Sequence, residues 1–195
     1  MNKVVAIVGM CGSGKSVATE LFENSGWKKV YFGGVTLRTL AECGLEVNPD
    51  NEKKIRENLR IQYGKQAYAV KLLPIIEQLL AESNVVLDGL YSWAEYKYLC
   101  DNLHTDLQVL CIASNRSKRY ERLKNRTIRP LTVEEAYQRD IAEIENLEKG
   151  GPVAIADNYI LNNGTMEEFI DKVNNFIKSI TKQNKISPNC KANEV

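Results

Sequence analysis

The sequence contains a single histidine, His104, and its five cysteines are widely spread, with no Cys-x-x-Cys pair. One histidine excludes a histidine-based metal centre, and scattered cysteines in odd number exclude a disulfide framework and a zinc ribbon. An excess of charge of one sign is also missing, because 26 Lys and Arg against 25 Asp and Glu give a net charge of +1. With positive and negative charges so nearly equal in number, the chain as a whole has no general attraction to nucleic acid or to an anionic membrane.

Long apolar runs are absent as well: none approaches the roughly 18 residues of a membrane-spanning helix. Residues 1–8 lack the charged and apolar regions of a secretory signal. With the cysteine usage, this predicts a cytoplasmic protein with no membrane partner and with nucleic acid disfavoured as a partner. The 195 residues, 44% hydrophobic and 26% charged, suit one globular domain. We expect that domain over residues 1–180 and a disordered polar tail over 181–195.

Short β-branched runs alternate with helical patterns along the chain, which predicts an α/β fold with a parallel sheet between two layers of helices. Two capping boxes, beginning at Thr132 and Thr165, mark helix starts, and Gly150-Gly151 is expected to end the first of these helices. Strands are expected at residues 3–8, 28–32, 84–87, 107–113 and 158–161. Helices are expected at residues 15–24, 94–102, 116–126, 132–149 and 165–180, with two or three more inside 36–82.

The most specific motif is Gly-Met-Cys-Gly-Ser-Gly-Lys-Ser at residues 9–16, which fits G-x-x-x-x-G-K-[ST] between a strand and a helix. Glycines let successive N–H groups turn inward toward phosphate oxygens, and the helix N-terminus that follows favours an anion. In this pattern Lys15 reaches the β and γ phosphates and the Ser16 hydroxyl coordinates Mg²⁺. The motif therefore predicts a site for ATP or GTP with Mg²⁺; an ordinary glycine-rich turn is the alternative. The predicted cofactor-binding residues are Gly9, Met10, Cys11, Gly12, Ser13, Gly14, Lys15 and Ser16.

Asp88 ends the third expected strand. In an open parallel sheet the carboxyl ends of the strands face the ligand, and a carboxylate there can hold the water shell of Mg²⁺. Asp88 is therefore a second predicted metal residue beside Ser16. The alternative is a turn-forming Asp-Gly pair.

Residues 116–129 contain seven Lys and Arg residues and a single acidic residue, Glu121. Arg122 and Arg126 are four residues apart and would share one face of a helix. A guanidinium that closes over a transferring phosphoryl group is worth about 10³–10⁵ in rate. The alternatives are a solvated basic face and a nucleic-acid surface, the latter weakened because only Tyr120 interleaves the charges.

Together these motifs resemble the small P-loop kinases of the nucleoside monophosphate kinase group, and within it the dephospho-CoA kinase-related proteins known mainly from archaea. The resemblance covers residues 3–180. It implies a three-layer P-loop fold with a five-stranded parallel sheet, a helical acceptor-binding insert at residues 36–82 and a short lid at residues 119–132. The resemblance rests on Gly9–Ser16, Gly33-x-x-x-x-Arg38, Leu59-Arg60, Tyr63-Gly64-Lys65, Leu87-Asp88-Gly89, the Arg119/Arg122/Arg126 series, Arg139-Asp140 and residues 155–164.

The resemblance also implies roles for single residues. Arg38 would bind the acceptor phosphate, and Arg122 and Arg126 would serve the lid and the donor phosphates. Arg139 would close on the transferring group, although an ion pair with Asp140, Glu143 or Glu135 on its own helix is the alternative. Asn162 and Gly164 would lie near the base of the donor nucleotide.

Two positions depart from the family pattern. Gly34 stands where the family has an aspartate able to act as a base toward a hydroxyl, and Tyr91 stands near the place of an arginine, where it offers a stacking surface. An acceptor phosphate is already ionised and needs no base. The leading hypothesis is a kinase that moves the γ-phosphoryl group of ATP or GTP to a small phosphorylated acceptor, such as a nucleoside monophosphate or dephospho-CoA. The loss at Gly34 favours the nucleotide, because dephospho-CoA would be phosphorylated on a hydroxyl. A regulatory or degenerate NTPase without an acceptor, and a polynucleotide-end kinase, are the alternatives.

Overall fold

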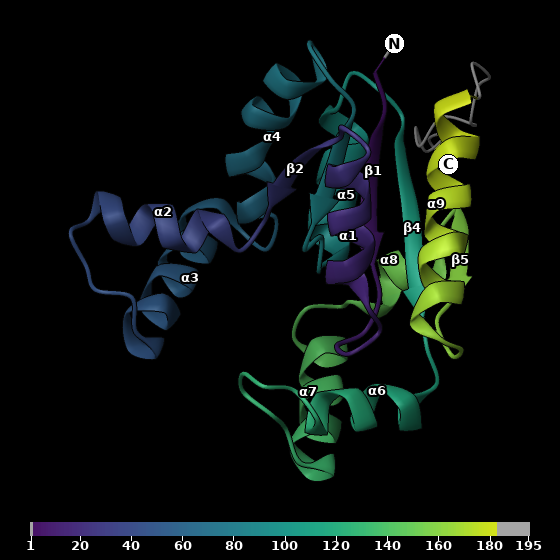
Figure 1. The fold of residues 1–195 in the computed structure, drawn as a ribbon. Helices are drawn as coiled ribbons and strands as arrows, with labels where there is room; N and C mark the ends of the chain where they lie inside the picture. The colour runs from purple at the N-terminus through teal and green to yellow at the C-terminus, as the bar shows by residue number, and fades with distance from the viewer. Residues whose placement is uncertain (1, 183–195) are drawn as a thin grey trace, which may run out of the picture.

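The computed structural model describes residues 2–182, which form five strands and nine helices labelled as in Figure 1. The strands are β1 (Val4–Val8), β2 (Lys28–Tyr31), β3 (Val85–Asp88), β4 (Leu107–Ala113) and β5 (Asn158–Leu161). The helices are α1 (Lys15–Asn24), α2 (Gly34–Glu42), α3 (Pro49–Tyr63), α4 (Ala67–Leu80), α5 (Trp93–Asn102), α6 (Arg116–Lys124), α7 (Val133–Glu145), α8 (Gly150–Ala154) and α9 (Met166–Lys182). The expected tail begins inside α9, and its remainder, residues 183–195, lies outside the described residues.

All strand pairs are parallel, in the order β2-β3-β1-β4-β5. β1 is buried at each of its five positions because both faces of the sheet are covered. Val4, Ala6 and Val8 pack into a core with α4 and α5 on one face, whereas Val5 and Ile7 pack with α1 and α9 on the other. The predicted three-layer α/β fold with a five-stranded parallel sheet is confirmed.

Two pairs of helices extend beyond these layers. In Figure 1, α2 and α3 project to the left of the sheet, and α6 and α7 lie below the carboxyl ends of the strands. α3 begins where Pro49 occupies the first turn and the Asn48 side chain accepts a hydrogen bond of 2.9 Å from the Asn51 N–H. It ends at Tyr63, before Gly64 at φ 77°. These local signals separate α3 from its neighbours and shape the projecting segment.

The end of α7 differs from the prediction of one helix over residues 132–149. The Thr132 capping box is present, but α7 ends at Glu145, and Gly150-Gly151 begins α8 instead of ending the helix. The chain turns at Glu148, whose φ is 53°, and the Lys149 N–H donates to the Glu143 carbonyl at 3.2 Å. This turn directs Lys149 back toward α7, which a prediction from glycine positions missed.

The predicted helix over residues 116–126 also ends early, since α6 stops at Lys124 and Asn125 caps it. Arg126 therefore lies in the connection to α7 and not on a shared helix face with Arg122. Pro130 disfavours helical backbone at the preceding residue, and Arg129 has φ 51°. The segment between α6 and α7 is thus irregular chain.

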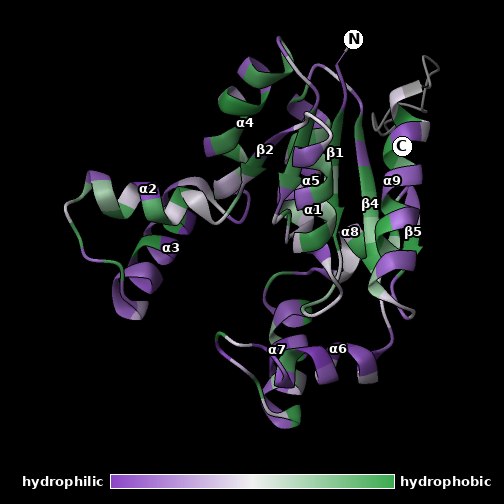
Figure 2. Ribbon diagram, viewed as in Figure 1, coloured by the Kyte–Doolittle hydropathy of each residue, from purple (hydrophilic) through white to green (hydrophobic). Residues whose placement is uncertain are grey.

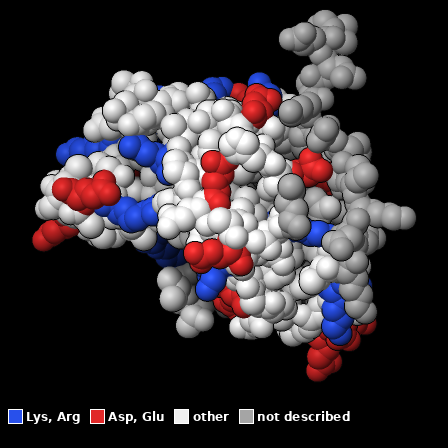
Figure 3. Space-filling view, turned by 90° about the horizontal axis from the view of Figure 1, so that it is seen from above, with Lys and Arg blue, Asp and Glu red and all other residues white. Residues whose placement is uncertain are grey.

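Hydropathy and charge follow these layers. The central strands are mostly hydrophobic, whereas α6 is mostly hydrophilic (Figure 2). Viewed from above, several Lys and Arg side chains gather at the left of the molecule, with acidic side chains among them (Figure 3). Within residues 2–182, no helix combines the length and the apolar character needed to cross a bilayer.

Candidate functional site

The carboxyl ends of the strands bring together segments that are far apart in the sequence. Residues 9–16, here called the phosphate-binding loop, follow β1, and Asp88 is the last residue of β3. Ser114 follows β4 and Asn162 follows β5 at the same edge. Parallel strands place their following loops on one side of the sheet, where ligands of such folds bind.

The phosphate-binding loop requires glycine at two positions, where the backbone has a positive φ and neighbouring atoms leave no space for a side chain. Gly9 has φ 139°, and a Cβ atom there would lie 2.3 Å from the Ile112 carbonyl oxygen. Gly14 has φ 106°, and a Cβ atom there would lie 2.4 Å from Asn162 Nδ2. Any side chain at either position would push the loop away from the sheet. Ser13 lies inside this tight curve, and its buried hydroxyl has no hydrogen-bond partner among the described residues.

Lys15, Ser16 and Asp88 are the predicted residues for phosphate and metal. The half-buried Lys15 ammonium donates to the Met10 carbonyl at 3.0 Å. Burial, reinforced by the charge of Lys149, lowers the pKa of Lys15 to about 8. Burial raises the pKa of Asp88, and the charges of Lys29 and Lys15 partly oppose it. The charge of Lys15 thus acts on Asp88 at the carboxyl edge of the sheet, and Ser16, the next residue after Lys15, is exposed.

The described residues contain no cluster of three or more His, Cys, Asp or Glu side chains able to hold a metal ion. Mg²⁺ bound with a nucleotide needs few protein ligands, because phosphate oxygens and water supply the others. One hydroxyl from Ser16 and one carboxylate from Asp88 are hard oxygen ligands that suit this ion. The glycine cradle and these two oxygens fit a magnesium nucleotide.

Asn162 and Arg122 support the phosphate-binding loop from the side of β5. Asn162 is buried, and its Nδ2 donates to the Ser13 carbonyl at 2.8 Å. Arg122 donates to the Asn162 carbonyl at 2.9 Å and to Ser114 Oγ at 3.2 Å. The Asn162 side chain thus binds the phosphate-binding loop within the protein. Arg122, Arg126 and Gly164 line one open depression of about 640 Å³, so these three predicted residues are brought together.

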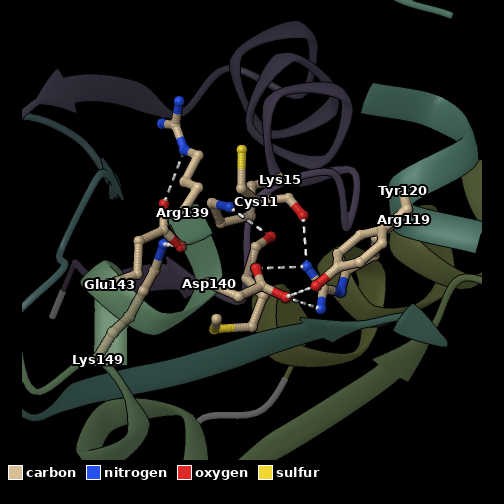
Figure 4. A network of polar contacts seen from close by, with 9 residues as sticks. Cys11, Lys15, Arg119, Tyr120, Arg139, Asp140, Glu143 and Lys149 are labelled. Carbon is tan, nitrogen blue, oxygen red and sulfur yellow. Dashed lines mark hydrogen bonds and ion pairs between the residues drawn. The ribbon is translucent and has the colours of Figure 1, made fainter. Parts of the chain in front are cut away.

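A buried ion pair that the sequence analysis missed connects α6 and α7 to the same loop (Figure 4). Arg119 donates to both Asp140 carboxylate oxygens, at 2.9 and 2.6 Å, and to the Cys11 carbonyl at 2.9 Å. The Tyr120 hydroxyl donates to Asp140 at 3.1 Å. Arg119 and Asp140 each belonged to a recognised motif, but nothing in the sequence pairs residues that lie 21 positions apart.

A second group comprises Arg139 and Glu143 on α7 and Lys149 at the start of α8 (Figure 4). Glu143 accepts from Arg139 Nε at 3.3 Å and from Lys149 Nζ at 2.7 Å. Arg139 thus makes one of the ion pairs expected on its own helix, while Asp140 is bound by Arg119. The Lys149 ammonium also lies 4.7 Å above the Tyr91 ring. Burial tends to raise the pKa of Glu143, but the charges of Lys149, Lys15 and Arg139 outweigh it and hold that pKa below its usual range.

Next to Asp88, a cavity of about 480 Å³ opens between the sheet and the projecting helices; we call it the insert cavity. Tyr91, for which a role in substrate binding is predicted, is one of its lining residues. Its charged lining residues are Arg56, Arg60, Lys65, Arg129, Glu52, Glu95 and Glu148. Arg56 pairs with Glu52 at 3.2 Å and Lys65 pairs with Glu148 at 2.5 Å. Within residues 2–182 neither Arg60 nor Arg129 forms an ion pair; both are exposed, and the charge of Arg60 acts on the Glu95 carboxylate without a direct contact.

Arg38, by contrast, is exposed and lines a separate hollow with Lys29 and Leu72. Tyr31 lies between that hollow and the insert cavity and lines both. The space beside Gly33 is taken by Tyr31, whose hydroxyl would lie 2.3 Å from a Cβ atom at that position. The structure therefore places an aromatic ring next to Gly34, the position at which the family pattern is lost.

Glu95 is a buried carboxylate in the wall of the insert cavity. It belongs to a capping box that begins α5, in which Ser92 accepts from the Glu95 N–H and Glu95 accepts from the Ser92 N–H, both at 3.1 Å. The Ser-x-x-Glu spacing was present in the sequence and could have shown this helix start. Burial raises the pKa of Glu95 to about 7, although these hydrogen bonds favour its ionised form.

The Arg119–Asp140 pair predicts strong coupling in a double-mutant cycle. Arg119→Met leaves a buried carboxylate without its partner and should lower the free energy of unfolding by about 3–5 kcal/mol. Adding Asp140→Leu removes that unpaired charge, so the double variant should be more stable than Arg119→Met alone. Urea unfolding followed by circular dichroism measures all four proteins; additive losses would contradict a direct buried pair.

Glu95 predicts a pH dependence of stability. Its pKa is about 7 in the folded chain against 4.5 as the ordinary value, so the folded state keeps a proton that the unfolded state releases. This contribution is complete below pH 4.5 and is lost as the pH rises to 7, by about 3 kcal/mol in all.

Glu95→Gln should therefore flatten the stability profile between pH 4.5 and 7 in urea unfolding. Glu135→Gln is the matched control, since Glu135 sits in an exposed capping box where hydrogen bonds from Thr132 lower its pKa. Its stabilisation is present above the ordinary pKa of 4.5 and is lost as the pH falls below it, so Glu135→Gln should leave the profile between pH 4.5 and 7 nearly unchanged. Equal effects of the two variants would refute the burial argument.

The architecture agrees with comparisons to solved structures. The fold is similar to that of the dephospho-CoA kinase from Campylobacter jejuni, with a TM-score of 0.61, 20% identity and coverage of 95% of this chain and 100% of that chain. It is also similar to the shikimate kinase from Acinetobacter baumannii in complex with shikimate, with a TM-score of 0.55, 15% identity and coverage of 94% and 97%. At such identities the similarity is one of fold, that of P-loop kinases.

Sequence comparison defines the family. The model of the AAA domain matches residues 5–143. A UPF0200 protein from Methanococcus maripaludis is 32% identical over 183 residues, which cover 92% of this chain and 98% of that protein. The narrower resemblance to dephospho-CoA kinase-related proteins stays a prediction. The phosphate-binding loop, the parallel sheet and these matches together show that the chain belongs to the UPF0200 family and carries an AAA-type P-loop domain.

Proposed function

We propose that the protein is a kinase that transfers the γ-phosphoryl group of ATP or GTP to a small anionic acceptor held in the insert cavity. The observation that carries this proposal is the position of that cavity, which begins at Gly89, one residue after Asp88, and is lined by two guanidinium groups that form no ion pair within residues 2–182. A donor site and an anion-binding acceptor site thus share the carboxyl edge of the sheet.

On the donor side, the amides of the phosphate-binding loop and the Lys15 ammonium would bind the phosphates of the nucleotide. Ser16 and Asp88 would hold Mg²⁺, which when bound neutralises charge on the phosphates. The open depression with Arg122, Arg126 and Gly164 has room for the nucleoside. Asn162 acts there through the loop, because its side chain supports the Ser13 carbonyl.

On the acceptor side, Arg60 and Arg129 approach the insert cavity from opposite segments, α3 and the connection between α6 and α7. A phosphate group on the acceptor would give both guanidiniums a counter-charge. Its oxygen is already ionised and would attack the γ-phosphoryl group without a base, which agrees with the loss of the aspartate at Gly34. Tyr31 and Tyr91 would offer ring surfaces to the rest of the acceptor. Catalysis would consist of positioning and charge neutralisation.

Substitution of the loop lysine tests the donor half of the proposal. Lys15→Ala removes the ammonium that faces the phosphates and should abolish phosphoryl transfer, while the circular dichroism spectrum and urea midpoint stay close to those of the unsubstituted protein. Lys178→Ala, an exposed lysine on α9, is the matched control and should keep full activity. The assay follows labelled ATP with a panel of nucleoside monophosphates and dephospho-CoA. Slow hydrolysis without transfer to any acceptor would favour the degenerate NTPase.

Two arginine substitutions test the acceptor half. Arg60→Ala should raise the KM for the acceptor about tenfold or more and leave the KM for ATP nearly unchanged, because it removes a charged contact in the insert cavity only. Arg38→Ala, outside that cavity, should change neither value. A raised acceptor KM for Arg38→Ala alone would support the role implied by the family resemblance and argue against the insert cavity.

A further inference from the structure

Lys149 has no role in the proposed function, yet it is the most buried charged residue among those described, with 1% of its surface exposed. Both its main chain and its side chain bind Glu143: the N–H donates to the Glu143 carbonyl at 3.2 Å and the ammonium to Glu143 Oε2 at 2.7 Å. The turn at Glu148, with φ 53°, makes this double contact possible. Residues with such backbone strain persist where the surrounding structure holds them.

Glu143 is shared by two cations, Lys149 and Arg139, and it lies close to a third, Lys15. Burial lowers the pKa of Lys15 most, the charge of Lys149 lowers it further, and the charge of Glu143 raises it. Figure 4 shows Lys15, Arg139 and Lys149 gathered around this carboxylate. Without Lys149, Glu143 would be a poorly compensated buried anion beside the loop lysine, and it would attract the Lys15 ammonium.

Lys149 also contacts the acceptor side. Its ammonium lies over the ring of Tyr91, and residues 146–148 just before it line the insert cavity. The Lys149–Glu143 pair therefore stands between the donor and acceptor sites.

We infer that Lys149 is a positioning residue: by pairing with Glu143 it leaves Lys15 free for the nucleotide phosphates and holds Glu143 where it orients Arg139. This inference rests on the proposed function. It adds a residue that acts through Glu143 and touches neither nucleotide nor acceptor.

The test compares the affinity for magnesium ATP, measured by calorimetry, in five proteins: the unsubstituted chain, Lys149→Met, Lys149→Met with Glu143→Gln, Lys15→Met, and Lys15→Met with Lys149→Met. Lys149→Met should weaken the affinity about tenfold, the order expected when a charge-assisted hydrogen bond to phosphate is lost. Glu143→Gln in the same chain should restore the affinity to within about twofold, because it removes the competing anion. In the Lys15→Met background, Lys149→Met should change the affinity by no more than about twofold, since the lysine through which it acts is gone.

The outcomes separate the two proposals. If the unsubstituted protein binds neither magnesium ATP nor magnesium GTP, the proposed function fails and this inference fails with it. In a second outcome, the unsubstituted protein binds ATP while Lys149→Met lowers the ATP affinity about tenfold in the Lys15→Met background as well. Lys149 is then merely structural, and only this inference is overturned. Failure of Glu143→Gln to restore affinity overturns it too. If circular dichroism shows that Lys149→Met does not fold, the test uses the Lys149→Met/Glu143→Gln protein. A magnesium ATP affinity about tenfold below that of the unsubstituted chain would then contradict the inference.

Discussion

The curvature of residues 9–16 is the constraint on which the candidate site depends. The loop can follow this path only because glycine occupies positions where the backbone is left-handed and where Ile112 and Asn162 leave no room for a Cβ atom. The same loop is held from two sides, by Arg119 on the Cys11 carbonyl and by Asn162 on the Ser13 carbonyl. A peptide of this sequence alone would lack both supports, so the loop's shape belongs to the assembled domain.

The supports also link the loop to elements that could respond to a ligand. Arg119 lies on α6 and its partner Asp140 on α7, so the helices beyond the carboxyl edge are connected to the loop by a buried ion pair. Lys149 and Glu143 connect α7 to Lys15 on one side and to Tyr91 on the other. Charge in this region is therefore arranged as neighbouring pairs with Lys15 at their centre. The proposed donor and acceptor sites share one electrostatic environment, in which burial makes each charge matter more than it would in water.

The insert cavity shows why local motifs can suggest an acceptor site without identifying the residues that line it. Arg38 has the spacing that the kinase resemblance implies for an acceptor residue, yet it lines another hollow, while Arg60 on α3 and Arg129 before α7 line the insert cavity. Which arginines form ion pairs depends on which carboxylates lie nearby. Glu52 pairs with Arg56, four residues away on the same helix, and this pair can be predicted from the helical repeat. Glu148 pairs with Lys65, 83 residues away, and no local pattern predicts that contact.

The sequence by itself determined the α/β class, the five parallel strands, the phosphate-binding loop and most helix starts, because each rests on local physics: periodicity, glycine at special backbone angles and capping side chains. The tertiary structure alone decided the ends of α6 and α7, the Arg119–Asp140 and Lys149–Glu143 pairs, and the residues that line the insert cavity. Those features depend on burial and on contacts between distant segments, whose electrostatic strength is set by surroundings that no local pattern encodes.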